Sequence, residues 1–171
     1  MNVHDFYENQ KVLDPETVRF LDNLYRATWP TLTKIERLEY NKTEREAYMQ
    51  KHEIDVILTC IGGRQKLVEE KIRRKDWGDD VLIEYLQSEG LNDPGWIYKL
   101  RDDVVLSYHI KPTRRTELLP GKWLKKAWLR HEDEWKSEYG VRHNPGANGT
   151  TWNCPVPTSV LWRAINDEQM R

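Results

Sequence analysis

Two acidic residues and one lysine, in neighbouring apolar segments, are the residues of this chain best suited to chemistry. Asp55 lies in the segment 52–58, and Glu69 and Lys71 lie in the segment 66–73. Two carboxylates can hold a hard divalent cation such as Mg²⁺ through their oxygens. Such a cation polarises a phosphoryl group and lowers the pKa of a bound water. A lysine beside it can stabilise developing charge or act on the water. These residue types indicate phosphodiester hydrolysis.

Apolar and polar residues alternate in both segments, which predicts two β-strands. The intervening Gly62-Gly63 predicts a hairpin. A strict two-residue turn at these glycines would set Asp55 opposite Glu70. We therefore expect a loop with an odd number of residues, or a bulge near Gly62-Gly63, so that Asp55, Glu69 and Lys71 share a face.

The short Glu-x-Lys pattern has an alternative interpretation. Charged residues make up 32% of the chain, so such a triplet also arises on a solvated strand face. The hydrolytic interpretation depends on three features together: an acid in the first apolar segment, the turn, and the triplet in the second. Because a neighbouring carboxylate favours the charged form of Lys71, we expect this lysine to stabilise charge rather than to remove a proton.

Composition bounds the class of protein. The 171 residues suffice for one domain, 1–171, with a Trp-rich helical C-terminal part at about 120–171. The net charge of -1 gives no global basic field. Cys60 and Cys154 provide neither a disulfide framework nor a zinc site. With no signal peptide and no membrane-spanning run, we expect a cytoplasmic protein that does not enter membranes.

Local patterns place the other elements. Asp14-Pro15 is a typical helix start. Turn residues cluster at 92–96 and 144–149. Trp128 and Trp135 belong to an apolar stripe at helical spacing, which favours packing against a sheet. The expected helices are 15–28, 41–51, 120–139 and 157–168, and the expected strands are 52–58, 66–73, 81–86 and 103–110.

The segments at 53–58, 69–73, 80–84, 95–96 and 103–108 together are similar to the PD-(D/E)xK (restriction-endonuclease-like) nuclease superfamily, in a branch of phage and bacterial proteins. The similarity covers roughly residues 42–110. It implies an α/β fold with a mixed central sheet of about four to five strands flanked by helices. It also implies a Mg²⁺ or Mn²⁺ cofactor, DNA as partner, Asp55 and Glu69 as metal ligands and Lys71 as the catalytic lysine. The chain departs from the pattern at Ile54, where the family has proline.

Further site candidates follow from position in the sequence. Glu46, on the predicted helix before Asp55, and Glu84, in the predicted strand 81–86, are additional candidate metal ligands. Glu84 alternatively pairs with a cation such as Arg73, because a lone buried carboxylate is costly. The candidates for nucleic-acid contact are Arg73, Arg114, Arg115, Lys122 and Lys126. A solvated helix face is the alternative for the two lysines.

Two functions of different class stay open at this point. The first is a divalent-metal-dependent nuclease acting on DNA, located in a bacterial cytoplasm or, if phage-encoded, in that of the host. The second is a catalytically inactive protein of the same fold that binds DNA or protein. A homodimer is also open, because a duplex cut in both strands needs two sites. The fold alone does not choose between them.

Overall fold

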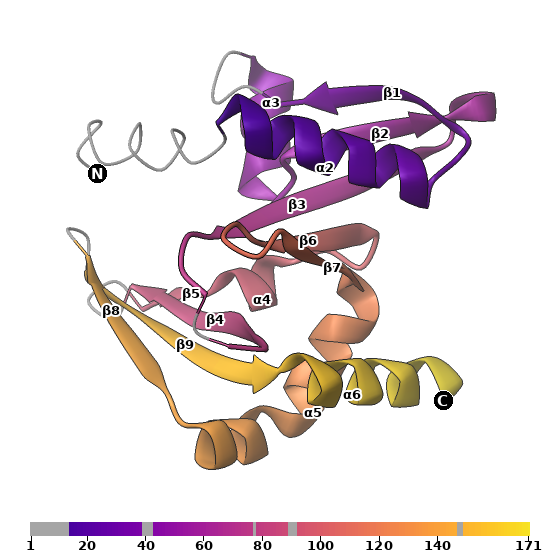
Figure 1. Ribbon diagram of the computed structural model, residues 1–171. Helices are drawn as coiled ribbons and strands as arrows, with labels where there is room; N and C mark the ends of the chain where they lie inside the picture. Colours follow the sequence, from indigo (N-terminus) through magenta and orange to yellow (C-terminus); the bar gives the residue numbers. More distant parts are fainter. Residues whose placement is uncertain (1–13, 39–42, 77, 89–91, 147–148) are drawn as a thin grey trace.

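The computed structural model describes residues 14–38, 43–76, 78–88, 92–146 and 149–171. Within these ranges the chain forms two sheets and five helices with a short 3-10 turn (Figure 1). The helices are α2 (Pro15–Thr28), α3 (Glu44–Lys51), α4 (Trp96–Lys99), α5 (Gly121–Tyr139) and α6 (Thr158–Met170), and the 3-10 turn is η1 (Ile61–Gly63).

The larger sheet is mixed and has five strands in the order β1-β2-β3-β6-β7. These strands are β1 (Leu32–Arg37), β2 (Val56–Cys60), β3 (Gln65–Arg73), β6 (Val104–Ile110) and β7 (Arg115–Pro120). Only β3 and β6 run parallel, and they lie at the centre, where both faces of the sheet are covered. The expected α/β class with a mixed five-stranded sheet flanked by helices is confirmed.

The smaller sheet has four antiparallel strands in the order β5-β4-β9-β8. They are β5 (Asp93–Pro94), β4 (Asp80–Ser88), β9 (Gly149–Pro157) and β8 (Arg142–Gly146). The predicted strand 81–86 therefore belongs to this second sheet, which the sequence analysis did not foresee. The strand β9 was not predicted, because the sequence indicated turn residues at 144–149 and a helix from 157 and left the residues between them unassigned. Pro155 and Pro157 pair with β4 on one side of β9. On the other side β8 pairs only with residues 149–153, so the missing N–H groups of the two prolines cost no hydrogen bond to β8.

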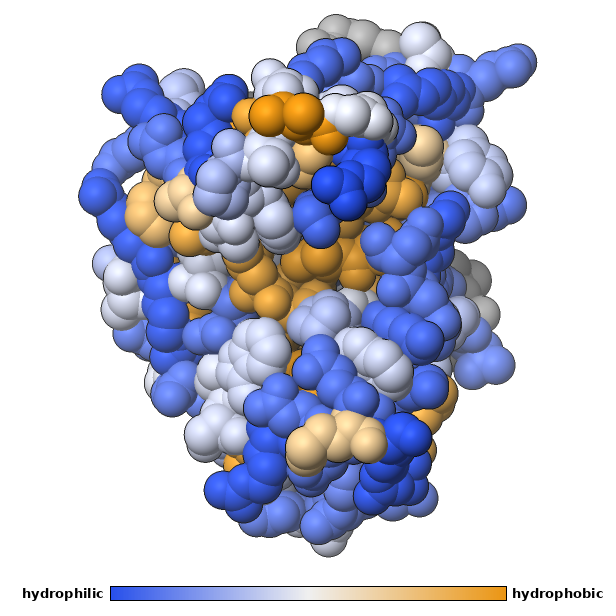
Figure 2. All heavy atoms as spheres, turned by 90° about the vertical axis from the view of Figure 1, so that its right-hand side faces the viewer, coloured by the Kyte–Doolittle hydropathy of each residue, from blue (hydrophilic) through white to orange (hydrophobic). Residues whose placement is uncertain are grey.

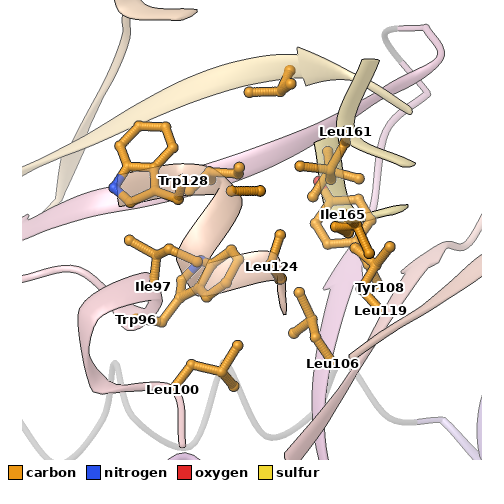
Figure 3. Close-up of a cluster of buried hydrophobic side chains, with 14 of the residues drawn as sticks. Trp96, Ile97, Leu100, Leu106, Tyr108, Leu119, Leu124, Trp128, Leu161 and Ile165 are labelled. Atoms are coloured by element: carbon orange, nitrogen blue, oxygen red, sulfur yellow. The ribbon is translucent and has the colours of Figure 1, made fainter. Parts of the chain in front are cut away.

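A single large apolar cluster fills the space between the two sheets and the helices α4, α5 and α6 (Figure 3). Trp128 is fully buried and Trp135 nearly so, which confirms the predicted packing role of the helix stripe. A second, smaller cluster lies under α2, where Leu21 and Tyr25 pack against Val68 of β3. Consequently the central strand β3 has a buried face on each side.

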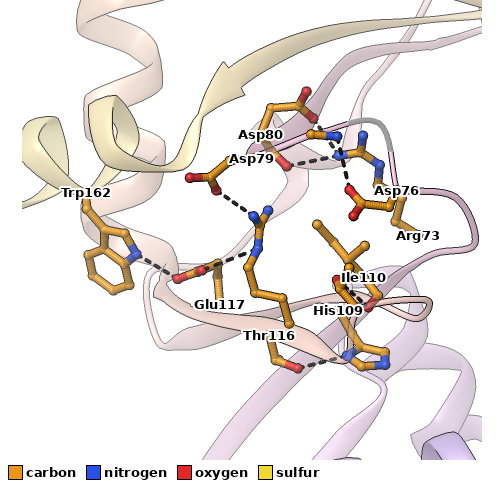
Figure 4. A network of polar contacts seen from close by, with 12 residues as sticks. Arg73, Asp76, Asp79, Asp80, His109, Ile110, Thr116, Glu117 and Trp162 are labelled. Carbon is orange, nitrogen blue, oxygen red and sulfur yellow. Dashed lines mark hydrogen bonds and ion pairs between the residues drawn. The ribbon is translucent and has the colours of Figure 1, made fainter.

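Polar contacts also connect the two sheets (Figure 4). The guanidinium of Arg73 on β3 donates to the carboxylate of Asp80 on β4 at 2.5 Å. Arg115 on β7 pairs with Asp79 at 2.7 Å, and Glu117 of the same strand accepts a hydrogen bond from the Trp162 indole of α6 at 2.9 Å. These contacts fix how β4 approaches the larger sheet.

On the side of the molecule shown in Figure 2, the surface is mostly hydrophilic, and apolar side chains show mainly in a central hollow with polar residues around it. None of the helices in the described ranges combines the length and apolar character that a membrane span requires.

Gly95 is the point at which the loop before α4 touches β4. A Cβ atom there would lie 2.1 Å from the Glu84 carbonyl oxygen and 2.6 Å from the Tyr85 nitrogen, both backbone atoms that cannot turn aside. We predict that Gly95→Ala lowers the free energy of unfolding by about 2 kcal/mol or more, because β4 and α4 must separate. Urea unfolding measures this.

The control for Gly95 is Gly63→Asn. Gly63 has a left-handed backbone, with φ of 77°, and no atom outside its own chain neighbours lies within 4 Å of the position that a Cβ would take there. Asparagine tolerates the left-handed conformation, so we expect a change below about 1 kcal/mol. An unfolding curve for Gly95→Ala that matches this control would contradict the close approach.

Candidate active site

The site begins where α3 ends. The Ile54 N–H donates to the Met49 carbonyl at 3.2 Å, which is the closing hydrogen bond of a Schellman-type helix end. Glu53 therefore adopts the left-handed conformation, with φ of 54°, at a position that glycine usually occupies. The cost is of the order of 1 kcal/mol. Strained non-glycine residues of this kind cluster at functional sites.

Asp55 follows immediately and lies one residue before β2, rather than inside the strand as the sequence analysis expected. The left-handed Glu53 delays the extended conformation, which explains the difference. The Asp55 N–H donates to the Val68 carbonyl at 2.9 Å, and Oδ2 of Asp55 accepts the N–H of Glu70 at 2.8 Å. The Asp55 carboxylate is thus fixed against β3 by the backbone.

The turn between β2 and β3 has the predicted odd length. Cys60 donates to the Arg64 carbonyl across the three residues Ile61–Gly63. The pairing of β2 with β3 ends at Val56↔Val68, and the Asp55 N–H donates to the carbonyl of the same Val68, so Asp55 lies beside β3 at the end of the ladder. The expected odd loop is confirmed.

Glu69, Lys71 and Glu53 form the charged centre of the site. The Lys71 ammonium forms an ion pair with the Glu69 carboxylate and lies 3.2 Å from Oε2 of Glu53. The Glu69 side chain is only 4% exposed, whereas that of Lys71 is 29% exposed. The ammonium therefore lies between a buried carboxylate and one nearer the surface.

Electrostatics in this cluster favour a protonated lysine. Burial alone would lower the pKa of Lys71, but the charges of Glu69, Glu53 and Asp55 outweigh it and raise that pKa above its ordinary value. Burial raises the pKa of Glu69 well above its usual range, and the charges of Asp55 and Glu53 add to this, while Lys71 opposes it. Lys71 is thus suited to stabilising charge and poorly suited to accepting a proton.

Glu84 lies at the border of the same cluster. Burial raises the pKa of Glu84, while the charge of Lys71 and a hydrogen bond from the Trp96 backbone lower it. The sequence analysis left open whether this acid serves the site or pairs with Arg73. Arg73 donates to Asp80, both to its carboxylate and to its carbonyl at 3.0 Å, so it is Lys71 rather than Arg73 whose charge stabilises the Glu84 carboxylate.

Glu70 occupies the opposite face of β3 and supports the site from behind. Its side chain is 1% exposed, and it accepts hydrogen bonds from the Tyr25 hydroxyl at 2.6 Å and from Arg37 at 2.7 Å. Arg37 also donates to Asp22 of α2 at 2.6 Å. Because the Glu70 N–H holds the Asp55 carboxylate, this network fixes the backbone that positions the candidate ligand.

Glu46 lies apart from this cluster. The Thr43 hydroxyl donates to the Glu46 carboxylate at 2.9 Å and accepts from its backbone N–H at 3.1 Å. The Thr43 hydroxyl thus caps the start of α3 and is itself held by the Glu46 carboxylate, which gives Glu46 a structural role. Of the predicted helix 41–51, residues 41 and 42 lie outside the described ranges.

The basic residues proposed for nucleic-acid contact lie in different parts of the fold. Arg73 and Arg115 belong to the network of Figure 4, and Arg114 forms an ion pair with the exposed Glu16. Lys122 and Lys126 flank the half-buried ring of Trp123 on α5, at 4.6 and 4.9 Å from its centre. Arg73 is buried, so its charge is not presented at the surface.

Two acids of this site carry ligands of the type that a hard divalent cation takes. Asp55 and Glu69 have carboxylate oxygens, which Mg²⁺ and Mn²⁺ prefer, and the Lys71 ammonium lies between Glu69 and Glu53. In the described part of the chain, no group of three or more His, Cys, Asp or Glu side chains is arranged to hold a metal ion. Lys71 contacts two of the acids that such a group would use.

Comparison with family models, with curated proteins and with solved structures gives no match for this chain.

Two residues of the site, Glu53 and Arg37, were not predicted from the sequence. Glu53 was read as one residue of an alternating strand, and only its left-handed backbone brings its carboxylate to Lys71. The support from Glu70 depends on β1, a strand that was not predicted, because Arg37 comes from its last position. The consecutive acids Glu69 and Glu70 in a strand indicated that a cation is needed on each face of the sheet, because successive side chains of a strand point to opposite faces.

The raised pKa of Glu69 leads to a prediction for stability. The folded chain keeps the Glu69 proton at pH values where the unfolded chain, with a pKa near 4.5, has lost it. The folded state then binds more protons, so this contribution to stability is complete below that pKa and is lost as the pH rises through the folded value. We predict that Glu69→Gln, which cannot ionise, is more stable than the wild type near pH 8.

Urea unfolding of both proteins across the pH range tests this, with the exposed acid of α3 altered in Glu44→Gln as the control. Below the unfolded pKa the Glu69→Gln and wild-type curves should coincide, and they should diverge as the pH rises. A Glu69→Gln variant that is less stable than wild type near neutral pH would show that the ion pair with Lys71 outweighs the cost of burial.

The network behind β3 leads to a second prediction. Arg37→Met leaves the Glu70 carboxylate buried without its cation, and we expect a loss of about 3 kcal/mol in the free energy of unfolding. Lys34→Met, which removes an exposed pair with Glu36 on the same strand, should cost less than about 1 kcal/mol. Equal unfolding midpoints for the two variants would contradict a supporting role for Arg37.

Proposed function

We propose that this protein is a divalent-metal-dependent nuclease that hydrolyses phosphodiester bonds, with DNA as the substrate, on a restriction-endonuclease-like fold. The observation that carries the proposal is the cluster at the β2–β3 hairpin, where Lys71 pairs with Glu69 and the Asp55 carboxylate is held on the neighbouring Glu70 N–H. Its resemblance to the PD-(D/E)xK pattern supports the same assignment.

Each residue has a distinct part in the proposed reaction. Asp55 and Glu69 would hold Mg²⁺ or Mn²⁺, with Glu84 at the border as a further acid and Glu53 as the second partner of Lys71. The cation, when bound, supplies polarisation of the phosphoryl group and a more acidic water. Lys71, kept charged by its acidic neighbours, donates to the negative charge that develops on the phosphoryl oxygens. The Glu70 N–H keeps Asp55 in position throughout.

A second candidate function has an observation in its favour. The Lys71 ammonium contacts both Glu69 and Glu53, and the described residues contain no assembled group of three metal-type ligands. A catalytically inactive protein of the same fold, which binds DNA or protein, would keep this ion pair permanently. Metal affinity separates the two functions, because only the nuclease requires Lys71 to release Glu69.

The setting of the proposed activity follows from the sequence. We propose that the protein acts in the cytoplasm of a bacterium, which is the host cell if the chain is encoded by a phage. Cleavage of both strands of a duplex would need two such sites, which a homodimer would supply. Sedimentation in the presence and absence of duplex DNA tests this part of the proposal.

Cleavage assays test the function directly. We expect purified protein to degrade labelled DNA with Mg²⁺ or Mn²⁺ and to be inactive with EDTA. Asp55→Asn and Lys71→Ala should each lower the rate by about a hundredfold or more, because the first removes a ligand of the cation and the second removes the charge that stabilises the reacting phosphate. Single-stranded, duplex and branched DNA should be compared side by side, together with RNA.

The matched control is Glu46→Ala. This acid lies on the same segment before Asp55 but holds the Thr43 hydroxyl that caps α3, so its loss should leave cleavage within about threefold of wild type while lowering stability slightly. Metal-dependent cleavage that survives in both Asp55→Asn and Lys71→Ala would place the activity elsewhere in the chain.

A further inference from the structure

An exposed aromatic pair lies on the helix that leads into the site. Tyr48 of α3 is 54% exposed, an unusual exposure for so large a ring. Its ring lies 4.1 Å, centre to centre, from the ring of His52, one helical turn later. The His52 ring nitrogen Nδ1 lies 2.6 Å from the Tyr48 carbonyl, which fixes the orientation of the imidazole. The two rings therefore form an aromatic surface that is fixed in orientation and partly exposed to solvent.

The position of this pair relates it to the charged cluster. His52 directly precedes Glu53, whose carboxylate contacts Lys71, so the backbone of the aromatic pair adjoins a residue of the charged cluster. On the other side, Arg101 lies near Tyr48. The pKa of Arg101 is raised chiefly by its hydrogen bonds with Asp103, with a smaller contribution from the Tyr48 hydroxyl. Arg101, in its ion pair with Asp103, therefore lies at the border of the aromatic surface.

The charge of the site explains why an uncharged contact would be useful there. The acids Glu53 and Asp55 outnumber the one lysine of the site even when Glu69 keeps its proton, and such a site repels the phosphates of a strand. Stacking of a base on an aromatic ring does not use the charge of the phosphates. It is also tolerant of sequence, because every base presents a π-face. A stacked base would hold a strand beside the acids in the absence of metal.

We propose that the Tyr48–His52 pair is a stacking platform for an unpaired base of a nucleic-acid strand, placed beside the charged cluster. The substrate class that it fits is a single strand, or a duplex with unpaired nucleotides next to the bond that is cut. This inference deepens the proposed nuclease function and rests on it for the choice of substrate. Binding to the platform itself needs neither metal nor cleavage.

Anisotropy titrations in EDTA test the platform. The full chain is titrated into fluorescein-labelled oligothymidylate and into the same backbone with abasic residues. We expect Tyr48→Ala to weaken binding to oligothymidylate by about tenfold and to leave binding to the abasic strand unchanged. Tyr48→Phe, which keeps the ring, should bind oligothymidylate as the wild type does. Circular dichroism checks that Tyr48→Ala is folded, as expected for an exposed position.

Three results would overturn the platform. They are an unchanged affinity of Tyr48→Ala for oligothymidylate, an equal loss for both strands, and a wild-type protein that does not distinguish the two strands. The proposed nuclease function fails separately, by absence of metal-dependent cleavage. A protein that cleaves DNA but shows any of the three results has the function without the platform. Base-dependent binding without cleavage supports the platform on an inactive protein.

Discussion

Two consecutive carboxylates, Glu69 and Glu70, are buried on opposite faces of the central strand β3, and the arrangement around them follows from that constraint. A buried carboxylate is unstable unless a cation or hydrogen-bond donors compensate for the lost hydration. Behind the strand, α2 and β1 supply Tyr25 and Arg37 to Glu70. In front, Lys71 pairs with Glu69 and is shared with Glu53. The two faces are therefore unequal.

The Glu70 face of β3 supports the fold, and the Glu69 face carries the residues proposed for chemistry. The Glu70 side is closed, with a neutral hydroxyl, a guanidinium and a second acid, Asp22, completing the network. On the Glu69 side the acids outnumber the cations, and burial raises the pKa of Glu69 in spite of Lys71. A further cation would relieve this excess. The left-handed backbone at Glu53 adds strain at the same place, which is typical of sites that exchange stability for function.

The sequence predicted what depends on local pattern. The alternation in 66–73 predicted β3, the Asp14-Pro15 start predicted α2, and the parity argument predicted the odd turn at Gly62-Gly63. What it missed depends on contacts between distant segments. The strand β1 gains its stability from pairing with β2, and β9 tolerates its prolines only because β8 ends before them. The contact of Glu53 with Lys71 needed a backbone conformation that glutamate rarely adopts.

The proposed nuclease requires that a divalent cation takes the place of the Lys71 ammonium beside Glu69. Anomalous diffraction from crystals grown with Mn²⁺ tests this requirement. We expect a manganese peak within bonding distance of one oxygen each of Asp55 and Glu69, with the Lys71 ammonium moved away from Glu69. Crystals with Mn²⁺ in excess that show no peak there, and the Glu69–Lys71 ion pair intact, would contradict the metal site and favour the inactive binding protein.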